Sequence, residues 1–391
     1  MLKTGLFVSL LVTIFISYNI QNEYYPDGLS QPLLMKTVTF LARVGVVDFL
    51  HAKRITLEFI INPIDLGYQD IQKEDTTMDG VPVRIYRPKE HSNSAPLPGM
   101  IYYHGGGWTL LSIDVYDPVT NYFSRRVNMV VISVGYRLNP EHSQKDGLDD
   151  CLKVTKHVIK MAGKYGIDPE RVVVSGDSTG GNYAAAVSLI LRDEQFMPMP
   201  KIQMLIYPVV QAIDLELPSY QENIHGPLLT PEFMHWFFSQ MFIKNNSFIP
   251  YLQTNTHVPD HIRQHYAKTI LDHNQDAIPQ ENRYPPYVRP NYDSGDSEIW
   301  DKIKDQILDP YHYPLMAKNH KGLPEAYIFT GHYDILRDEG YIYAAILRNA
   351  GIKVTHDNLS KGWHGMIQFI HINNDSKDAI DKMCAFLREN L

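Results

Sequence analysis

Cysteine is scarce in this chain: Cys151 and Cys384 are the only two among 391 residues. Two cysteines cannot make a disulfide framework. Each is expected on a helix, and the two helices are expected on opposite faces of a sheet, so both are predicted to be free, buried thiols. Although the chain has 17 His, it lacks a His-Glu-x-x-His motif and any paired cysteine spacing of the zinc type. We therefore expect neither a metal site nor a cofactor.

Positive charge is also in short supply. The chain carries 36 Lys and Arg against 44 Asp and Glu, for a net charge of −8, and shows no basic stripe. A nucleic-acid partner is therefore not expected. The composition is that of an ordinary globular protein, at 44% hydrophobic and 20% charged residues. The length suits one large α/β domain with insertions.

Only one apolar run has a length near that of a membrane span, and it opens the chain. It extends from residue 5 to about residue 18, with Lys3 before it and acidic residues after it. Its length falls between that of a cleaved signal and that of a full span. Because no small-x-small cleavage site follows, residues 1–20 are predicted to be a single transmembrane signal anchor with the N-terminus cytosolic. Secretion after signal cleavage is the alternative. Three Asn-x-Ser sequences would permit glycosylation of a lumenal domain, at Asn245, Asn358 and Asn374.

The remainder of the chain alternates apolar strands with helices. This alternation predicts an α/β fold with a mostly parallel central sheet and helices on both faces. Helices are expected over residues 21–75, contributing to a lid, followed by a catalytic domain over 76–391 that starts with a hairpin turning at Asp79-Gly80. An irregular stretch at about 211–318 is interpreted as an insertion that completes the lid. The predicted strands are 100–103, 129–134, 171–174, 202–207, 326–329 and 353–357, and the predicted helices are 115–126, 147–164, 179–192, 233–242, 338–350 and 376–389.

A Gly-x-Ser-x-Gly motif lies between an apolar strand and a helix, with Ser178 at its centre. A serine in a strained strand-to-helix turn exposes its hydroxyl above the sheet. Gly176 and Gly180 lack the Cβ atoms that would collide as the chain turns back. The pattern alone is weak, but this setting predicts that Ser178 is a nucleophile.

A run of glycines, His104-Gly105-Gly106-Gly107-Trp108, follows the strand that ends at residue 103. Such a run lets backbone N–H groups approach a substrate carbonyl as it becomes an oxyanion. A phosphate-binding loop would need other residues, which are absent. Gly105, Gly106 and the amide of Thr179 are predicted to form the oxyanion hole, and His104 is expected to shape the loop.

The acid and the base should follow the serine in the order Ser, acid, His. Asp334 stands just past a predicted strand, whereas Asp338 and Glu339 are expected to be carboxylates at a helix start. His364 lies between flexible residues after the last predicted strand, so Asp334 and His364 are predicted to complete a catalytic triad with Ser178. The rival histidines are His332, His356 and His371, and surface or core roles are expected for the last two.

Taken together, these motifs resemble the hormone-sensitive-lipase group of α/β-hydrolases, and within it the arylacetamide deacetylases. The resemblance covers almost the whole length, including Tyr136 to His142 and Trp363-His364-Gly365. It implies a membrane-anchored enzyme of the endoplasmic reticulum, single-pass type II with a lumenal catalytic domain, that acts on ester and arylacetamide bonds. Two departures are notable: Thr179 stands where the family usually has Ala or Ser, and residues 143–147 differ from the usual Phe-Pro-Ala stretch.

The first choice of function is thus a serine carboxylesterase or deacetylase acting on small hydrophobic esters or amides. A lipase acting on neutral lipid would use the same anchor and lid, and the sequence does not separate the two. A ligand-binding protein on the hydrolase fold is a further alternative, and the presence of His364 counts against it.

Overall fold

The computed structural model describes residues 36, 69–89, 95–266, 278–279 and 295–391. Its centre is one eight-stranded sheet in the order β1-β2-β4-β3-β5-β6-β7-β8. The first three strands in that order pair antiparallel, and every later pair is parallel. The predicted mostly parallel sheet is confirmed. The strands are β1 Ile71–Met78, β2 Val81–Pro88, β3 Leu97–Tyr103, β4 Val130–Val134, β5 Ile167–Asp177, β6 Ile202–Ile206, β7 Glu325–Tyr333 and β8 Val354–Trp363.

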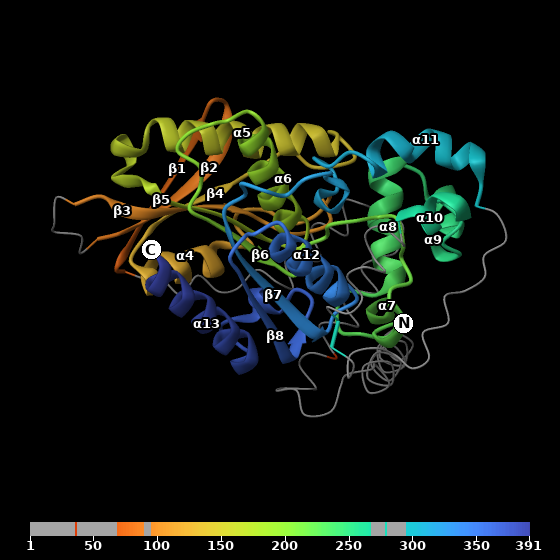
Figure 1. The fold of residues 1–391 in the computed structure, drawn as a ribbon. Coiled ribbons are helices and arrows are strands. Elements are labelled where there is room, and N and C mark those ends of the chain that lie inside the picture. Colours follow the sequence, from red (N-terminus) through yellow and green to blue (C-terminus); the bar gives the residue numbers. More distant parts are fainter. Residues whose placement is uncertain (1–35, 37–68, 90–94, 267–277, 280–294) are drawn as a thin grey trace, which may run out of the picture.

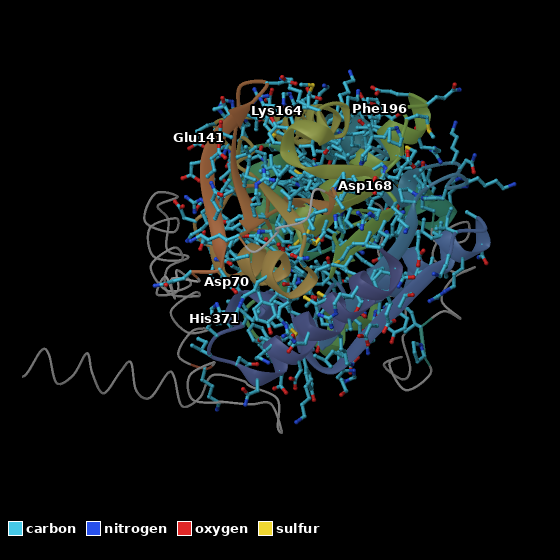
Figure 2. The ribbon with its side chains drawn as sticks, turned by 90° about the vertical axis from the view of Figure 1, so that its left-hand side faces the viewer. Asp70, Glu141, Lys164, Asp168, Phe196 and His371 are labelled. Atoms are coloured by element: carbon cyan, nitrogen blue, oxygen red, sulfur yellow. The ribbon has the colours of Figure 1, made fainter. Side chains whose placement is uncertain are left out.

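Helices cover both faces of the sheet, as predicted. Figure 1 shows α5 and α6 on one side of the strands and α4 and α13 on the other. β3, β4 and β6 are buried along their whole length, which explains their mostly apolar sequences. Side chains fill the space between sheet and helices (Figure 2). The covering helices are α4 Asp117–Val127, α5 Gln144–Lys160, α6 Thr179–Asp193, α12 Arg337–Asn349 and α13 Asn374–Asn390.

The predicted insertion lies between β6 and β7 and forms a cluster beside the sheet (Figure 1). Its longer helices have conventional starts: Thr230 caps α8 and Asp296 caps α11 through side-chain hydrogen bonds to backbone N–H groups. Among the described residues of this insertion, the α-helices are α7 Pro218–Glu222, α8 Pro231–Phe242, α9 Ile249–Gln253, α10 Asp260–Tyr266 and α11 Ser297–Ile307.

Several predicted boundaries are wrong by a few residues, such as those of β5 (expected at 171–174) and α5 (expected at 147–164), and two further errors change how a segment is assigned. Residues 71–75 were expected in the N-terminal helices, but they form the start of β1, paired with β2. The last strand was expected to end at 357, but β8 continues to Trp363. β8 is an edge strand whose residues from 354 to 359 are all half-buried, so no alternation of apolar and polar residues marks its length. Residues 143–147, where the sequence departs from the family, form the capped start of α5.

The cysteine prediction is confirmed: Cys151 on α5 and Cys384 on α13 are buried and free. Of the sequons, Asn245 and Asn374 are exposed and Asn358 is half-buried. The predicted anchor at 1–20 lies outside the described residues. Of the helices expected over 21–75, only Lys36 and the residues from 69 onward are described. Within the described ranges, no helix combines the length and apolar character that crossing a membrane requires.

Candidate active site

The sheet register brings the chemical groups together. Tyr103 at the end of β3 pairs with Gly176 near the end of β5, so the glycine loop and the Ser178 turn both begin at the carboxyl-terminal ends of these parallel strands. Tyr333 on β7 pairs with Trp363 on β8, and the next residues of the two strands are Asp334 and His364. All these groups therefore lie together at the carboxyl-terminal ends of the parallel strands.

Ser178 occupies a strained turn. Its backbone φ is 55° and ψ is −120°, between the end of β5 and the start of α6. A Cβ on Gly176 would lie 2.4 Å from the carbonyl oxygen of Tyr103, and one on Gly180 would lie 1.9 Å from the same oxygen. The two glycines are thus required by close backbone packing, as the motif predicted.

The three predicted triad residues form a continuous hydrogen-bonded chain. His364 Nε2 lies 2.9 Å from Ser178 Oγ, and His364 Nδ1 lies 2.8 Å from Asp334 Oδ2. The other oxygen of Asp334 accepts the backbone N–H of Leu336 at 2.8 Å. Asp334 is fully buried, while Ser178 and His364 are 8% and 7% exposed. This is the geometry of a nucleophile, a base and an orienting acid.

The rival residues take the structural places expected of them. Asp338 and Glu339 lie in the first turn of α12. Their carboxylates accept backbone N–H groups from the insertion: Asp338 from Ser219 at 2.7 Å and Glu339 from Val210 at 2.8 Å. They anchor the start of the insertion to α12. Outside the pocket lie His332 beside Glu222, His356 bonded to Thr330, and His371, labelled in Figure 2.

One predicted oxyanion donor is wrong. The N–H of Gly105 is donated to Asp177 Oδ1 at 2.9 Å, and Gly105 does not line the pocket. Gly106, Gly107 and Thr179 do line it. The sequence placed the glycine run correctly, but the backbone of the loop faces the pocket one residue later, because the buried Asp177 carboxylate takes the first amide.

Close contacts hold the loop in this shape. Gly106 has a φ of +116°, and a Cβ there would lie 2.2 Å from the carbonyl oxygen of Leu110. The hydroxyl of Thr179 accepts the N–H of Trp108 at 3.3 Å. His104 stacks on Tyr136 at 4.3 Å, and burial lowers its pKa to about 4, so it shapes the loop as a neutral ring, as expected.

Asp177 is a group whose importance the motif did not reveal. Its carboxylate also accepts the hydroxyls of Tyr102 at 2.9 Å and Tyr116 at 2.7 Å. Burial raises its pKa to about 6, against the opposing effect of these hydrogen bonds. Its position before Ser178 was the only sequence signal, because the tyrosines that bind it come from β3 and from the residue preceding α4.

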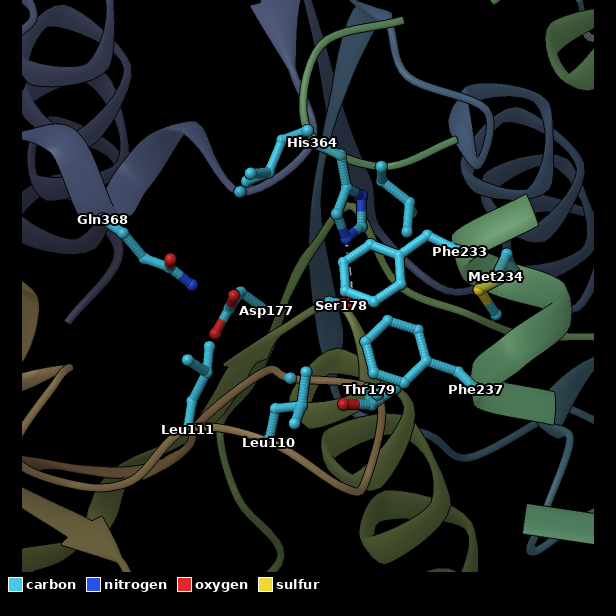
Figure 3. Close-up of a pocket in the computed structure, with 15 residues that line it drawn as sticks. Leu110, Leu111, Asp177, Ser178, Thr179, Phe233, Met234, Phe237, His364 and Gln368 are labelled. Carbon is cyan, nitrogen blue, oxygen red and sulfur yellow. Dashed lines mark hydrogen bonds between the residues drawn. The ribbon is translucent and has the colours of Figure 1, made fainter. Parts of the chain in front are cut away.

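The pocket above Ser178 has two unlike sides. α8 contributes Phe233, Met234 and Phe237 on one side of the serine, while Asp177 and Gln368 lie on the other (Figure 3). The cavity has a volume of about 590 Å³ including its open mouth, a size suited to a small-molecule ligand. Further apolar lining comes from Leu110, Leu111, Leu228 and Leu229.

The insertion contacts the oxyanion loop directly. A Cβ on Gly107 would lie 1.9 Å from the ring of Phe237, so only glycine permits α8 to pack this closely. The sequence predicted a lid over this region but could not say which of its side chains face the serine. The apolar character of α8 is nearly continuous, so no periodic pattern singled out Phe237.

Among the described residues, no group of three or more His, Cys, Asp or Glu side chains could hold a metal ion. The site is thus a Ser-His-Asp chain beside backbone N–H groups, beneath an apolar helix. An arrangement of this kind can attack an acyl carbon and stabilise the oxyanion that results.

Comparison with known proteins agrees with this geometry. A family model described as the alpha/beta hydrolase fold matches residues 100–258 and 254–368. The chain belongs to the α/β-hydrolases, in their hormone-sensitive-lipase group, and is an esterase- or lipase-like hydrolase of that group.

Individual relatives are similar along most of their length. The chain is 35% identical to arylacetamide deacetylase of Oryctolagus cuniculus over 88% of this chain and 89% of that protein. It is 33% identical to neutral cholesterol ester hydrolase 1 of Rattus norvegicus, with 88% of each chain covered. Among solved structures, an esterase of Pyrobaculum calidifontis superposes with a TM-score of 0.64 at 25% identity, covering 88% of this chain and 94% of the esterase.

Proposed function

We propose that this protein is a serine carboxylesterase that hydrolyses esters, and arylacetamides, of hydrophobic alcohols and amines through an acyl-serine intermediate. The observation that carries the proposal is the unbroken chain Ser178–His364–Asp334, opening into an apolar pocket. The relatives named as an arylacetamide deacetylase and a cholesterol ester hydrolase support the ester and amide chemistry.

Each group has a defined step in this mechanism. Ser178 Oγ attacks the acyl carbon while His364 Nε2 takes its proton, and Asp334 holds the Nδ1–H and stabilises the imidazolium. The backbone N–H groups of Gly106, Gly107 and Thr179 are assigned to the developing oxyanion. His364 then protonates the leaving alcohol or amine. In the second half, His364 activates a water that releases the acid from Ser178.

The test combines turnover with covalent labelling. Purified protein should hydrolyse short-chain p-nitrophenyl esters and react with a fluorophosphonate probe, and Ser178→Ala should abolish both. Ser175→Ala is the matched control, because Ser175 is a buried serine of β5, the strand that leads into Ser178, and lies outside the pocket. Labelling that survives Ser178→Ala would sink the proposal.

A neutral-lipid lipase is the second candidate, supported by the apolar α8 wall and by the cholesterol ester hydrolase relative. A series of acyl chain lengths separates the two. Preference for acetyl to butyryl chains supports the carboxylesterase, and a rise in kcat/KM toward long chains in emulsion supports the lipase.

We also propose that residues 1–20 anchor the protein in the endoplasmic reticulum membrane with its catalytic domain in the lumen. The lysine before the apolar run, the acids after it and the exposure of Asn245 and Asn374 support this arrangement. In cells, a glycosidase-sensitive shift in mass that disappears in the Asn245→Gln/Asn374→Gln double variant is expected. A fully cytosolic, unglycosylated protein would contradict it.

A further inference from the structure

Tyr207, the residue after β6, has a strained backbone. Its φ is 35°, in the region that residues with a side chain rarely adopt. Strain of this kind persists where the surrounding structure enforces it, and it is concentrated at functional sites. Two backbone hydrogen bonds enforce it here: Tyr207 N–H is donated to the Phe329 carbonyl at 2.7 Å, and Ser178 N–H to the carbonyl of Ile206 at 2.8 Å. Tyr207 is thus fixed between the Ser178 turn and β7, the strand that leads to the acid.

The side chain of Tyr207 packs against the proposed base. The ring centroids of Tyr207 and His364 lie 4.6 Å apart, with an interplanar angle of 49°. Tyr207 is fully buried and does not line the pocket, so it contacts the imidazole from outside the substrate cavity. Phe329 borders the same tyrosine ring, with centroids 6.2 Å apart. The strained residue therefore presents a supported aromatic ring to His364.

The hydrogen bonds of His364 do not by themselves fix its ring. Nδ1 lies 2.8 Å from Asp334 Oδ2, and Nε2 lies 2.9 Å from Ser178 Oγ. Both bonds form at nitrogens in the plane of the imidazole, so they resist a tilt out of that plane only weakly. A closely packed neighbouring ring resists such a tilt directly, through van der Waals contact. This restraint is valuable because a misplacement of about 1 Å can slow a reaction about 10²-fold.

We propose that Tyr207 is a positioning residue that holds the His364 imidazole in line with Ser178, and that the strained backbone serves this contact. The inference deepens the proposed function and rests on it, because His364 must act as the base. Since the contact is made by the ring, the ring and not the hydroxyl carries the effect. Since Tyr207 lies outside the cavity, the effect falls on kcat and not on KM.

Two substitutions separate the ring from the hydroxyl. Tyr207→Phe keeps the ring and should retain the wild-type kcat on a short-chain ester. Tyr207→Met removes the ring and fills its space with a flexible side chain. In this variant kcat should fall about 10²-fold with KM nearly unchanged, and Tyr207→Leu replaces it if the methionine variant does not fold. An equal loss in Tyr207→Phe, or a wild-type kcat without the ring, would overturn the proposal.

Tyr343→Met is the matched control. Tyr343 on α12 is also fully buried and also packs against a histidine, His320, with ring centroids 5.6 Å apart. Removing this ring should lower the melting temperature and leave kcat at the wild-type value. A loss of kcat equal to that of Tyr207→Met would show that any buried aromatic ring has the same effect, and would contradict a specific role for Tyr207.

A spectroscopic signal separates this proposal from the catalytic one. The His364 Nδ1 proton, bound to the Asp334 carboxylate, should give a low-field proton NMR resonance that His364→Gln removes. Tyr207→Phe and Tyr343→Met should keep this resonance. Tyr207→Met should broaden it, because an imidazole that can tilt exchanges this proton faster with water. An unchanged resonance in Tyr207→Met would overturn the proposal, whereas failure of ester turnover in a protein that shows this dependence would count only against the proposed function.

Discussion

The carboxyl-terminal ends of the strands and the inserted helices contribute to one pocket in different ways. Ser178, Asp334 and His364 all follow strand ends, so backbone ladders fix their separations. α8 instead contributes whole side chains, with Phe233 and Phe237 stacked at 4.6 Å, held by packing alone. The difference teaches that the chemistry depends on hydrogen-bonded strands, whereas the choice of substrate depends on a helix that substitution can reshape without disturbing the sheet.

The two regions are nonetheless coupled. Glu339 on α12 accepts hydrogen bonds from Val210, Gln211 and Tyr220 at the start of the insertion. At the pocket, the Phe237 ring lies against Gly107. A change in α8 can therefore reach the oxyanion loop, and the predictions below measure how far the two regions act independently.

The largest effect is expected from Asp334→Asn. An asparagine cannot hold the imidazole in the required tautomer, and kcat should fall by about 10⁴-fold, as in other Ser-His-Asp hydrolases. The measurement is kcat on a short-chain ester. Asp338→Asn is the control: it disrupts the buried pair with Arg337 and should lower the melting temperature with little effect on kcat. Equal losses of kcat in both variants would break the distinction between catalytic and anchoring carboxylates.

Gly106→Ala should have the next largest effect. The added Cβ meets the Leu110 carbonyl at 2.2 Å and the φ of +116° disfavours alanine, so the loop must shift away from the substrate oxyanion. Loss of one oxyanion donor lowers kcat by about 10²–10³-fold. Gly163→Ala, with no atom near its Cβ, is the control and should leave kcat unchanged. An unaltered kcat in Gly106→Ala would remove this loop from the mechanism.

Phe237→Ala tests the contribution of the inserted helix α8. It removes an aromatic wall of the pocket, so kcat/KM should fall by about tenfold for aromatic or long-chain esters and much less for acetyl esters. The acyl-chain series measures this change. Phe242→Ala, on the same helix outside the pocket lining, should retain the wild-type preference. A uniform loss for all esters would mean that α8 acts through Gly107 rather than through substrate contact.

The smallest effect expected is the change in stability with pH that comes from the titration of Asp177. Burial raises its pKa from 3.8 to about 6, so between about pH 4 and pH 6 the folded protein binds a proton that the unfolded chain has released. Stability from this group is therefore lost as pH rises through that window, by up to about 3 kcal/mol. Urea midpoints of wild type and Asp177→Asn should converge or cross between pH 4 and 6 and run parallel above 6.

Asp168, at the start of β5, should show a pH dependence of stability opposite in sign to that of Asp177. A hydrogen bond from Arg171 lowers its pKa, so its contribution to stability is lost as pH falls through the acid range. Asp168→Asn should thus have its full effect on stability above about pH 4, and the effect should decline only as pH falls further, through the lowered pKa. A wild-type minus Asp177→Asn difference that is flat from pH 4 to 6 would contradict the assignment of the titration to Asp177.

Much of the sheet was predictable, because its strands are short apolar runs between helices with clear ends. β8 was not, since an edge strand with half-buried residues has no alternation to mark where it ends. The triad was predictable because each member has a local motif. Gly105 was assigned wrongly because the partner of its N–H, Asp177, lies 72 residues away along the chain.

The sequence by itself determined the order of strands and helices, the strained serine turn and the three residues that form the triad. These depend on local chemistry: glycines where a Cβ would collide, and polar residues directly after apolar strands. Tertiary structure alone decided which loop amides face the serine, which α8 rings line the pocket and which tyrosines bind the Asp177 carboxylate. Each of those depends on partners brought together from distant segments, and no local pattern records a contact of that kind.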